Sequence, residues 1–262
     1  MPTSALHVAR TGLEAQDMRM RVIANNLANI GTTGFKRDRA DFQTLAYQDT
    51  RVAGQQSTNE SAYAVGLNLG TGVAVQGTSR INTQGTLNTS GNGFDLALDG
   101  PGFFQVERPG GQLVYTRAGN FTLSGDGQLV TAQGFAVQPA IQIPPGAQSV
   151  AIAPDGTVSA IVPGDSAPAE LGQITVASFP NPAGLQALGD NFLAETAASG
   201  AVELGAGGEA GRGSIRQGML EASNVNVVEE LVEMIEAQRA YEINSKMISS
   251  VDEMLRNANQ TL

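Results

Sequence analysis

Few side chains in this sequence have the types and the spacing that catalysis or metal binding requires. The single histidine, His7, has no second metal ligand at helical spacing, which favours a packing or surface role over a metal site. Asp95 and Asp99 could form a carboxylate pair for acid–base catalysis, but strand alternation predicts that both lie on an exposed strand face, with Asp99 in a turn. The chain has no cysteine, which excludes disulfides, thiolate catalysis and cysteine-ligated metals.

Glycine-containing motifs that could bind phosphate or calcium are incomplete. The Asp-Gly pairs at 126–127 and 155–156 lack the further oxygen ligands of a calcium loop and are typical of turns. The run 205–208 is not followed by the Gly-Lys-Ser/Thr of a phosphate-binding loop, and 70–72 precedes a predicted strand instead of a helix. The sequence therefore predicts no catalytic, cofactor-binding or metal site, and we expect a protein that is not an enzyme.

Composition narrows the possible partners and location. The formal net charge of −10 over 262 residues disfavours a nucleic-acid partner. No apolar run is long enough to span a bilayer, so we expect no membrane insertion. The first ten residues lack a basic stretch followed by an apolar one, so a cleaved secretory signal is not predicted. Two locations fit: the cytosol, or the outside of the cell by a route without a cleaved signal.

The two ends of the chain are predicted to be helical. Residues 221–256 contain no glycine or proline, and their apolar residues recur at alternating steps of four and three, which is typical of one face of a helix. This stripe is formed by Val227, Leu231, Met234, Tyr241, Ile248 and Leu255, and is widened by Val228, Ile235 and Val251. The N-terminal stripe is formed by Leu6, Ala9, Leu13, Gln16, Met20, Ile23, Leu27 and Ile30. Its spacing is that of a coiled-coil seam, so both stripes are expected to need partner helices, from this chain or from other copies.

Charge favours pairing between the two ends. Residues 1–39 carry six basic and three acidic groups, a net charge of +3, whereas residues 221–262 carry three basic and eight acidic groups, a net charge of −5. Opposite fields favour the N-terminal helix against the C-terminal one. Gln16 and Gln238 interrupt the two stripes. They either fix the register of the seam or lie at its solvated edge.

The middle of the chain has a different composition. Of 32 glycines, 29 lie between residues 40 and 220, together with 10 of the 11 prolines. Short alternating apolar runs separated by Asp-Gly and Pro-Gly turns predict an antiparallel β-sandwich or barrel. The polar stretch 48–62 is typical of a long surface loop or linker, and 205–213 of a glycine-rich hinge leading to the last helix.

The predicted fold class is therefore α+β. Long N- and C-terminal helices pair as a coiled-coil-like stalk, and the central part forms an antiparallel β-rich domain. Four regions are expected. They are an N-terminal core helix with its turn (1–39), a polar extension (40–70), a β-rich outer domain (71–213) and a C-terminal core helix (214–262).

Motifs at both ends resemble those of the bacterial flagellar rod and hook proteins. The N-terminal motif runs from Asn25 to Lys36 and includes Asn26, Leu27, Asn29, Gly34 and Phe35. The C-terminal motif includes Asn224, Asn226, Arg239 and Tyr241. The middle is also similar at 102–106, 115–117 and 134–135, so the resemblance covers nearly the whole chain. Gly31 departs from the pattern, where a polar residue is expected.

The resemblance implies a structural subunit of the flagellar axial tube, with the terminal helices in the inner core and the β-rich part outside. It implies a helical homopolymer in the basal body, export unfolded through the flagellar type III apparatus, and contacts with the proximal rod, the hook and the P and L rings. The length and the 48–62 stretch are most similar to the distal-rod branch, a rigid periplasm-spanning drive shaft. That stretch is implied to be present in the straight rod and absent from the curved hook.

Three alternatives remain open at this stage. The chain could be a proximal rod or hook subunit, or a β-domain dimerised by a coiled coil without any filament. A secreted β-rich hydrolase is the third, and it lacks the carboxylate pair that such an enzyme needs.

Overall fold

The computed structural model describes residues 2–52, 54–58, 61–162 and 168–260. The fold is α+β, as predicted, with long helices near both ends and antiparallel strands between them. The chain divides into two compact units. The helical unit comprises residues 1–27, 38–79 and 226–262, and the β-rich unit comprises 28–37 and 80–225. The backbone therefore passes between the units four times, at 27/28, 37/38, 79/80 and 225/226.

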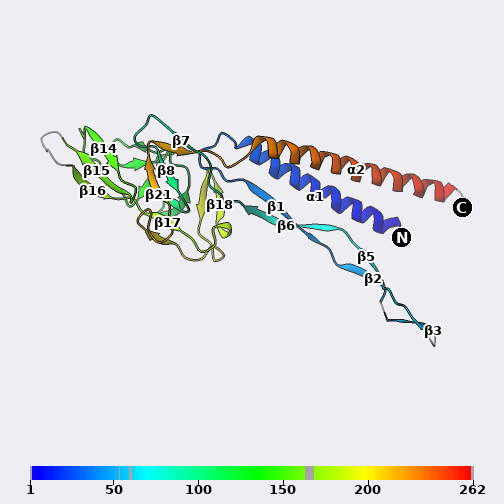
Figure 1. Cartoon of the computed structure of the whole chain (residues 1–262). Coiled ribbons are helices and arrows are strands. Elements are labelled where there is room, and N and C mark those ends of the chain that lie inside the picture. Colours follow the sequence, from blue (N-terminus) through cyan, green and yellow to red (C-terminus); the bar gives the residue numbers. More distant parts are fainter. Residues whose placement is uncertain (1, 53, 59–60, 163–167, 261–262) are drawn as a thin grey trace. The chain divides into compact units, whose positions relative to one another are not determined.

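The helical unit is built on α1 (Pro2–Ala28) and α2 (Val227–Gln260), which run antiparallel (Figure 1). Asn26 near the end of α1 contacts Glu230 near the start of α2, whereas Gly12 faces Asn244 further along. A Cβ on Gly12 would lie only 3.0 Å from the Asn244 amide nitrogen, so the absence of a side chain lets the helices approach closely there.

The sequence pattern gave the wrong start for α2. Residues 221–226 are not helical, and Glu221 instead ends strand β22 (Met219–Glu221). The helix begins at Val227 because the Asn226 side-chain oxygen accepts a hydrogen bond from the Val228 amide at 3.1 Å, as an N-cap residue does. Asn226 marks this boundary in the sequence. The absence of glycine and proline from residue 221 onward nevertheless favoured an earlier start of the helix.

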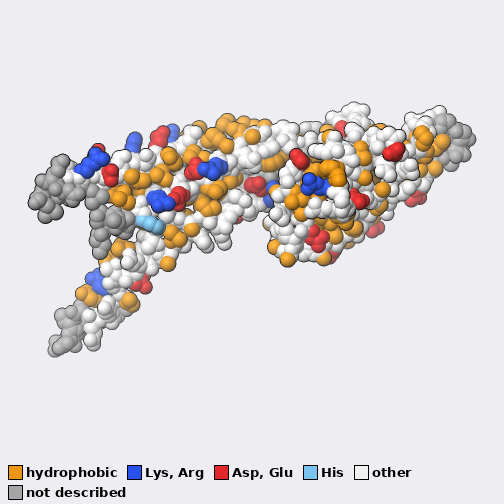
Figure 2. All heavy atoms as spheres, turned by 180° about the vertical axis from the view of Figure 1, so that it is seen from behind, with side chains coloured by type: hydrophobic (Ala, Val, Ile, Leu, Met, Phe, Trp, Pro, Cys, Tyr) orange, Lys and Arg blue, Asp and Glu red, His pale blue; other side chains and the backbone are white. Residues whose placement is uncertain are grey.

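The face that α2 buries within its own chain coincides with the predicted stripe only at Val251. Its buried positions, Glu230, Ala237 and Val251, are spaced by multiples of seven residues. On α1 the buried apolar residues are Ala9, Ala15 and Ile23. The chain thus buries several alanines between its own helices and leaves larger apolar side chains of α2 exposed. Figure 2 shows apolar side chains on the surface of the helical unit.

A two-stranded ribbon completes the helical unit. Strand β1 (Asp38–Thr44) pairs with β6 (Val73–Arg80), β2 (Tyr47–Arg51) with β5 (Leu67–Gly70), and β3 (Gln56–Thr58) with β4 (Ser61–Ala62). The prediction of a loop or linker over 48–62 was therefore wrong for the residues described there. The main chain pairs, but the described side chains of this ribbon are mostly exposed, so no hydrophobic alternation marked the strands.

The β-rich unit contains a nine-stranded antiparallel sheet in the order β11-β12-β13-β9-β10-β19-β18, with β17 pairing with both β9 and β20. The strands are β9 (Phe103–Arg108), β10 (Gln112–Thr116), β11 (Thr122–Leu123), β12 (Leu129–Val130), β13 (Ala136–Gln138), β17 (Val176–Ser178), β18 (Gln186–Gly189), β19 (Phe192–Ala194) and β20 (Glu203–Gly205). A 3-10 turn, η1 (Pro182–Gly184), precedes β18. These strands form open paths, so the barrel alternative is not supported among the described residues.

The β-rich unit also contains smaller sheets. They comprise β14 (Ser149–Ile152), β15 (Thr157–Ile161) and β16 (Ala169–Gln173) in one sheet, β21 (Ser214–Gln217) with β8 (Leu96–Asp99), and β22 with β7 (Leu87–Thr89). The last two pairs correct the predicted hinge. The chain after 213 makes two more strands before α2, and Ile215 of β21 is fully buried.

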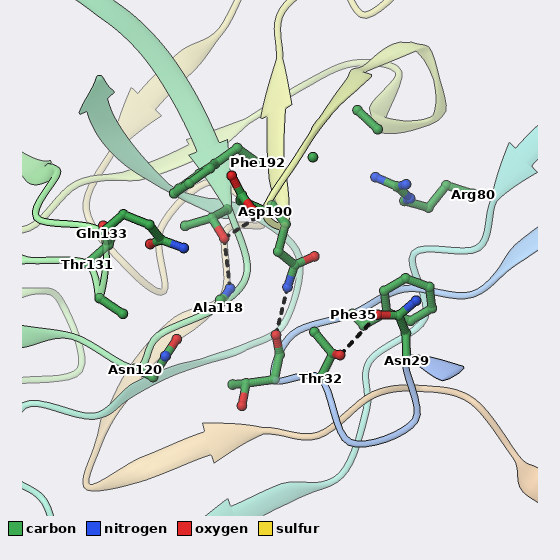
Figure 3. Close-up of a pocket in the computed structure, with 16 residues that line it drawn as sticks. Asn29, Thr32, Phe35, Arg80, Ala118, Asn120, Thr131, Gln133, Asp190 and Phe192 are labelled. Atoms are coloured by element: carbon green, nitrogen blue, oxygen red, sulfur yellow. Dashed lines mark hydrogen bonds between the residues drawn. The ribbon is translucent and has the colours of Figure 1, made fainter. Parts of the chain in front are cut away.

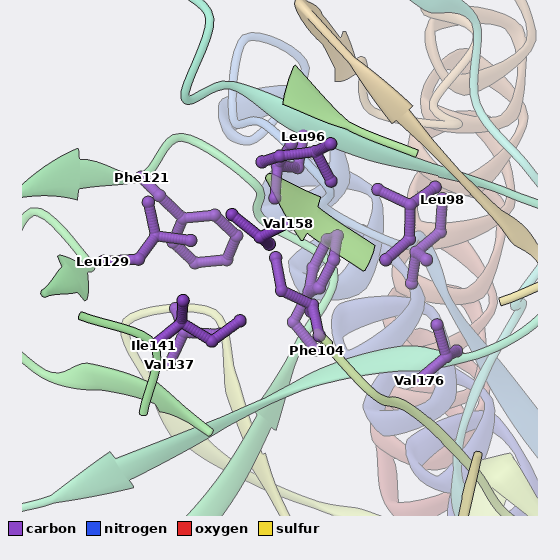
Figure 4. Close-up of a cluster of buried hydrophobic side chains, with 12 residues drawn as sticks. Leu96, Leu98, Phe104, Phe121, Leu129, Val137, Ile141, Val158 and Val176 are labelled. Carbon is purple, nitrogen blue, oxygen red and sulfur yellow. The ribbon is translucent and has the colours of Figure 1, made fainter. Parts of the chain in front are cut away.

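The main hydrophobic core lies in the β-rich unit (Figure 4). Leu96, Leu98 and Phe104 are completely buried there, and the Phe104 and Phe121 rings meet edge to face with centroids 5.2 Å apart. The predicted strands around 96–98, 103–106, 113–115 and 150–152 are confirmed. Their alternation was readable because one face of each strand packs into this core.

The three residues considered above for catalysis or metal binding are Asp95, Asp99 and His7, and each has a local contact in the structure. Asp95 is buried, not exposed as predicted, and hydrogen bonds from the Ser90 hydroxyl and the Asn92 amide compensate for its burial. Asp99 is exposed and pairs with Arg216 at 3.1 Å. His7 is exposed beside the Thr71 carbonyl. No group of three acidic or histidine side chains in the described part of the chain could hold a metal ion. No described helix has the length and apolarity needed to cross a membrane.

Candidate functional site

The N-terminal motif residue Asn26 joins three segments of the helical unit. Its side-chain oxygen accepts a hydrogen bond from the Asp38 amide at 2.9 Å, and its nitrogen donates to the Asp38 carbonyl at 2.9 Å. The same nitrogen lies 3.2 Å from both carboxylate oxygens of Glu230 on α2. Asn26 and Glu230 are both buried. The amide therefore ties the end of α1 to the start of β1 and to α2.

Asn224 of the C-terminal motif does the same within the β-rich unit. Its side-chain oxygen accepts a hydrogen bond from the Arg37 amide at 2.8 Å, and its nitrogen donates to the Ile81 carbonyl at 2.8 Å and the Thr83 carbonyl at 3.1 Å. An asparagine side chain carries one donor and one acceptor group in the geometry of a peptide unit. Each motif asparagine thus replaces backbone pairing where segments distant in sequence converge.

Replacing Asn224 with alanine should destabilise the β-rich unit by about 1–3 kcal/mol, because the Arg37 amide and the Ile81 carbonyl lose their partner. Asn88 provides a matched control, since it is an exposed asparagine in β7 of the same unit. Urea unfolding followed by tyrosine fluorescence measures both variants. Equal midpoints for N224A and N88A would show that the Asn224 network contributes nothing to stability.

A buried ion cluster lies next to Asn224. The Lys36 ammonium is 2.6 Å from one carboxylate oxygen of Glu221, and the Arg117 Nε is 2.8 Å from the other. The side chain of Lys36 is 5% exposed, that of Arg117 6% and that of Glu221 0%. The Gly85 amide also donates to Glu221, at 2.9 Å. The cluster joins residues that are 104 and 185 positions apart in the sequence.

Burial and pairing oppose one another in this cluster. Burial by itself raises the pKa of Glu221, but the charge of Arg117 and the hydrogen bonds from Arg117, Lys36 and Gly85 together hold that pKa below its usual value. For Lys36, burial lowers the pKa and the Glu221 carboxylate only partly offsets the effect. None of these three residues was predicted to have a role. Lys36 and Arg117 lie at the ends of the motif segments 25–36 and 115–117, which was the available signal.

Gly34 shows why the N-terminal motif contains a glycine. Its φ is +67°, and a Cβ there would lie 2.6 Å from the Arg117 carbonyl carbon. Its amide donates to the Glu221 carbonyl at 2.8 Å. Only a residue without a side chain lets the 28–37 loop pack this closely on the segment after β10.

The remaining predicted residues differ in burial. Among the motif residues, Asn25, Asn226, Arg239 and Tyr241 are exposed, whereas Leu27, Asn29 and Phe35 are half-buried. Of the predicted polymerisation core, Ile23 is buried, Leu6, Leu13, Met20, Leu27, Met234 and Ile248 are half-buried, and Ile30, Val227, Leu231, Ile235 and Tyr241 are exposed. Leu255 lies outside the described side chains. The single chain therefore leaves much of the predicted α2 stripe uncovered.

A pocket of about 440 Å³ lies in the β-rich unit, between the 28–37 loop and the turn that joins β18 to β19 (Figure 3). Asn191 in that turn donates to the Thr33 carbonyl at 2.7 Å and accepts from Thr116 through its own carbonyl at 3.0 Å. Asp190 is the one carboxylate among the described lining residues. The pocket wall thus serves to fasten the loop, and its lining lacks the carboxylate pair of a glycosidase-type site.

Comparison with known proteins gives three family matches, to separate parts of the chain. Residues 6–36 match the "Flagella basal body rod protein" family, 97–160 the "Flagellar hook protein FlgE/F/G D1 domain" and 216–261 the "Flagellar basal body rod FlgEFG protein C-terminal" family. The first match contains Asn26, the middle one contains Arg117 and the last one contains Asn224.

Individual relatives match over nearly the full length. The chain is 49% identical to the flagellar basal-body rod protein FlgG of Buchnera aphidicola from Acyrthosiphon pisum, covering 98% of both chains. It is 46% identical to the FlgG of Caulobacter vibrioides, covering 98% of both chains. To the flagellar basal-body rod protein FlgF of the same Caulobacter strain it is 34% identical, covering 99% of this chain and 98% of the other.

Proposed function

The chain belongs to the family of flagellar rod and hook proteins, and from that membership we propose that it is a structural subunit of the distal rod in the flagellar basal body. The higher identity to FlgG than to FlgF of one organism, 46% against 34%, supports this assignment. The subunit would polymerise into the rigid shaft that carries motor torque to the hook. A structural role agrees with a family of rod proteins and needs no catalytic site.

The observation that carries the proposal is the exposed apolar face at the start of α2. Val228 is 68% exposed, Val232 51% and Ile235 50%, all within two and a half helical turns. Apolar side chains gathered in this way on a helix mark a surface that another protein covers. We propose that other copies of the chain cover it, and that the predicted α1 and α2 stripes form coiled-coil-like seams between subunits.

The finer assignments follow from the same proposal. The predicted polymerisation residues of α1 and α2 would lie in the inner core of the shaft, and the β-rich region 71–213 would lie outside. Heterologous contacts that do not close on themselves give an open helical assembly. Its ends would join the proximal rod and the hook, and its outer surface would face the P and L rings. Export through the flagellar type III apparatus without a cleaved signal belongs to this proposal.

Two measurements test the proposal. In a strain lacking this gene, motility and hook assembly should be lost and then restored by the wild-type gene, with basal bodies in electron micrographs ending below the hook. In vitro, raising the protein concentration should produce long particles of increasing length. A fixed dimer mass at every concentration, seen by light scattering, would instead support the coiled-coil module without a filament.

Deleting residues 48–62 should change the shape of the assembled shaft without preventing assembly. We propose that this extension of the ribbon packs against neighbouring subunits and blocks the compression that bending requires. Electron microscopy of the variant polymer should show curved particles where the wild type gives straight ones. Replacing the same stretch with a Gly/Ser sequence of equal length separates loss of contacts from shortening of the chain. Straight polymers from both variants would contradict the role of the extension.

A further inference from the structure

The buried ion cluster contains two cations and one anion. Lys36 comes from the loop after α1, Arg117 from the segment after β10, and Glu221 from the end of β22. The other partners of the two cations, among the described residues, are backbone carbonyl oxygens. Lys36 donates to Thr83 at 2.6 Å, and Arg117 donates to Leu98, Gly100 and Gly102 at 2.8–3.3 Å. Glu221 therefore provides the negative charge of the cluster.

Without Glu221, docking the 28–37 loop would bury Lys36 beside Arg117 with no counter-charge. Burying an unpaired charge is strongly unfavourable, and here two like charges would share one site. The loop would lose neutral contacts as well, because the Gly34 amide donates to the Glu221 carbonyl and the Asn224 amide to the Phe35 carbonyl. The segment that carries Glu221 thus supplies the loop with both its charge balance and its backbone partners.

We propose that Glu221 makes docking of the 28–37 loop conditional on docking of the 219–225 segment, so that the two terminal segments enter the β-rich unit together. Lys36 is synthesised 185 residues before Glu221. The loop therefore stays undocked, with Lys36 in water, until most of the chain exists. This coupling concerns the folding of the β-rich unit and does not depend on the proposed rod function.

The lysine content of the chain provides a direct test. Lys36 and Lys246 are its two lysines, and Lys246 is exposed on α2. In the full-length wild type, acetylation followed by mass spectrometry should modify Lys36 on the order of tenfold more slowly than Lys246, because Lys36 reacts only after local opening. In E221Q the Lys36 rate should rise toward that of Lys246. E203Q removes an equally negative side chain from an exposed site in β20 and should leave the ratio unchanged.

Hydrogen exchange separates undocking of the loop from unfolding of the whole unit. In E221Q, the amides of Gly34 and Phe35 should lose their protection entirely, whereas those of β9 and β10 should stay protected at the lower level set by global unfolding. The double variant K36M/E221Q has one cation fewer, and its loop should regain protection relative to E221Q. The proposal is overturned if Lys36 stays protected in E221Q, if β9 becomes as unprotected as the loop, or if the loop of the double variant is no better protected than that of E221Q.

Discussion

Replacing Ile235 with aspartate should abolish growth into long particles and leave the β-rich unit folded. Ile235 is 50% exposed in the single chain, so a charged side chain there costs the monomer little. In a seam between subunits the same aspartate would be buried in apolar surroundings without a partner, at a cost of several kcal/mol for each contact. Because every subunit repeats the defect, the loss of assembly should be complete. Electron microscopy and sedimentation measure it.

Leu204 offers a control that is matched in chemistry and exposure. It is an apolar residue of β20 in the β-rich unit and is 47% exposed, so L204D introduces the same charge at a similar site. We expect L204D to assemble like the wild type. Normal polymers from I235D, or equal loss of assembly in both variants, would show that the α2 face is not what drives subunit association. Circular dichroism of each variant confirms that the monomer remains folded.

Removing the Glu221 charge should give the largest loss of stability in the β-rich unit. E221Q leaves Lys36 and Arg117 buried without their anion, and breaking a buried pair in this way costs about 3–5 kcal/mol near neutral pH. Asn88 in β7 again provides an exposed control site in the same unit. Guanidinium unfolding of the wild type, E221Q and N88A measures the difference. A loss below about 1 kcal/mol in E221Q, the range of exposed pairs, would contradict a buried ionic contribution.

The lowered pKa of Glu221 predicts how the unfolding free energy of the β-rich unit depends on pH. The pKa of Glu221 in the folded protein lies below the ordinary glutamate value of 4.5. Its contribution is therefore fully present above pH 4.5 and is lost as pH falls through the lowered folded-state pKa. The difference in unfolding free energy between wild type and E221Q should be greatest between that pH and neutrality and should shrink as the pH falls below 4.5. The pKa values of Asp41 and Asp155 are also lowered, but both groups are present in both proteins and cancel.

Hydrophobic periodicity predicted the helices and strands that have one apolar face and one polar face. The strand around Phe104 alternates because one side packs into the core, and both terminal helices carry apolar stripes. It failed where burial is absent, as in the β2–β5 ribbon, where pairing rests on backbone hydrogen bonds. It also failed at residue 221, where a segment without glycine or proline suggested a helix although Glu221 ends a strand.

The site was predicted only as a set of motifs. Asn26 and Asn224 were singled out, but a local pattern does not show that each amide joins three segments. The Lys36–Glu221–Arg117 cluster could not be predicted from one sequence, because Glu221 lies 185 and 104 positions from its two partners and each residue resembles an ordinary surface charge. Such contacts depend on how the strands pair, which periodicity does not specify.

The four backbone crossings between the helical and the β-rich unit have a consequence for limited proteolysis. Each unit is assembled from separate stretches of the sequence, so neither unit can be excised as one continuous fragment. A protease that cuts at any one of the crossings therefore leaves the two units covalently joined through the other three.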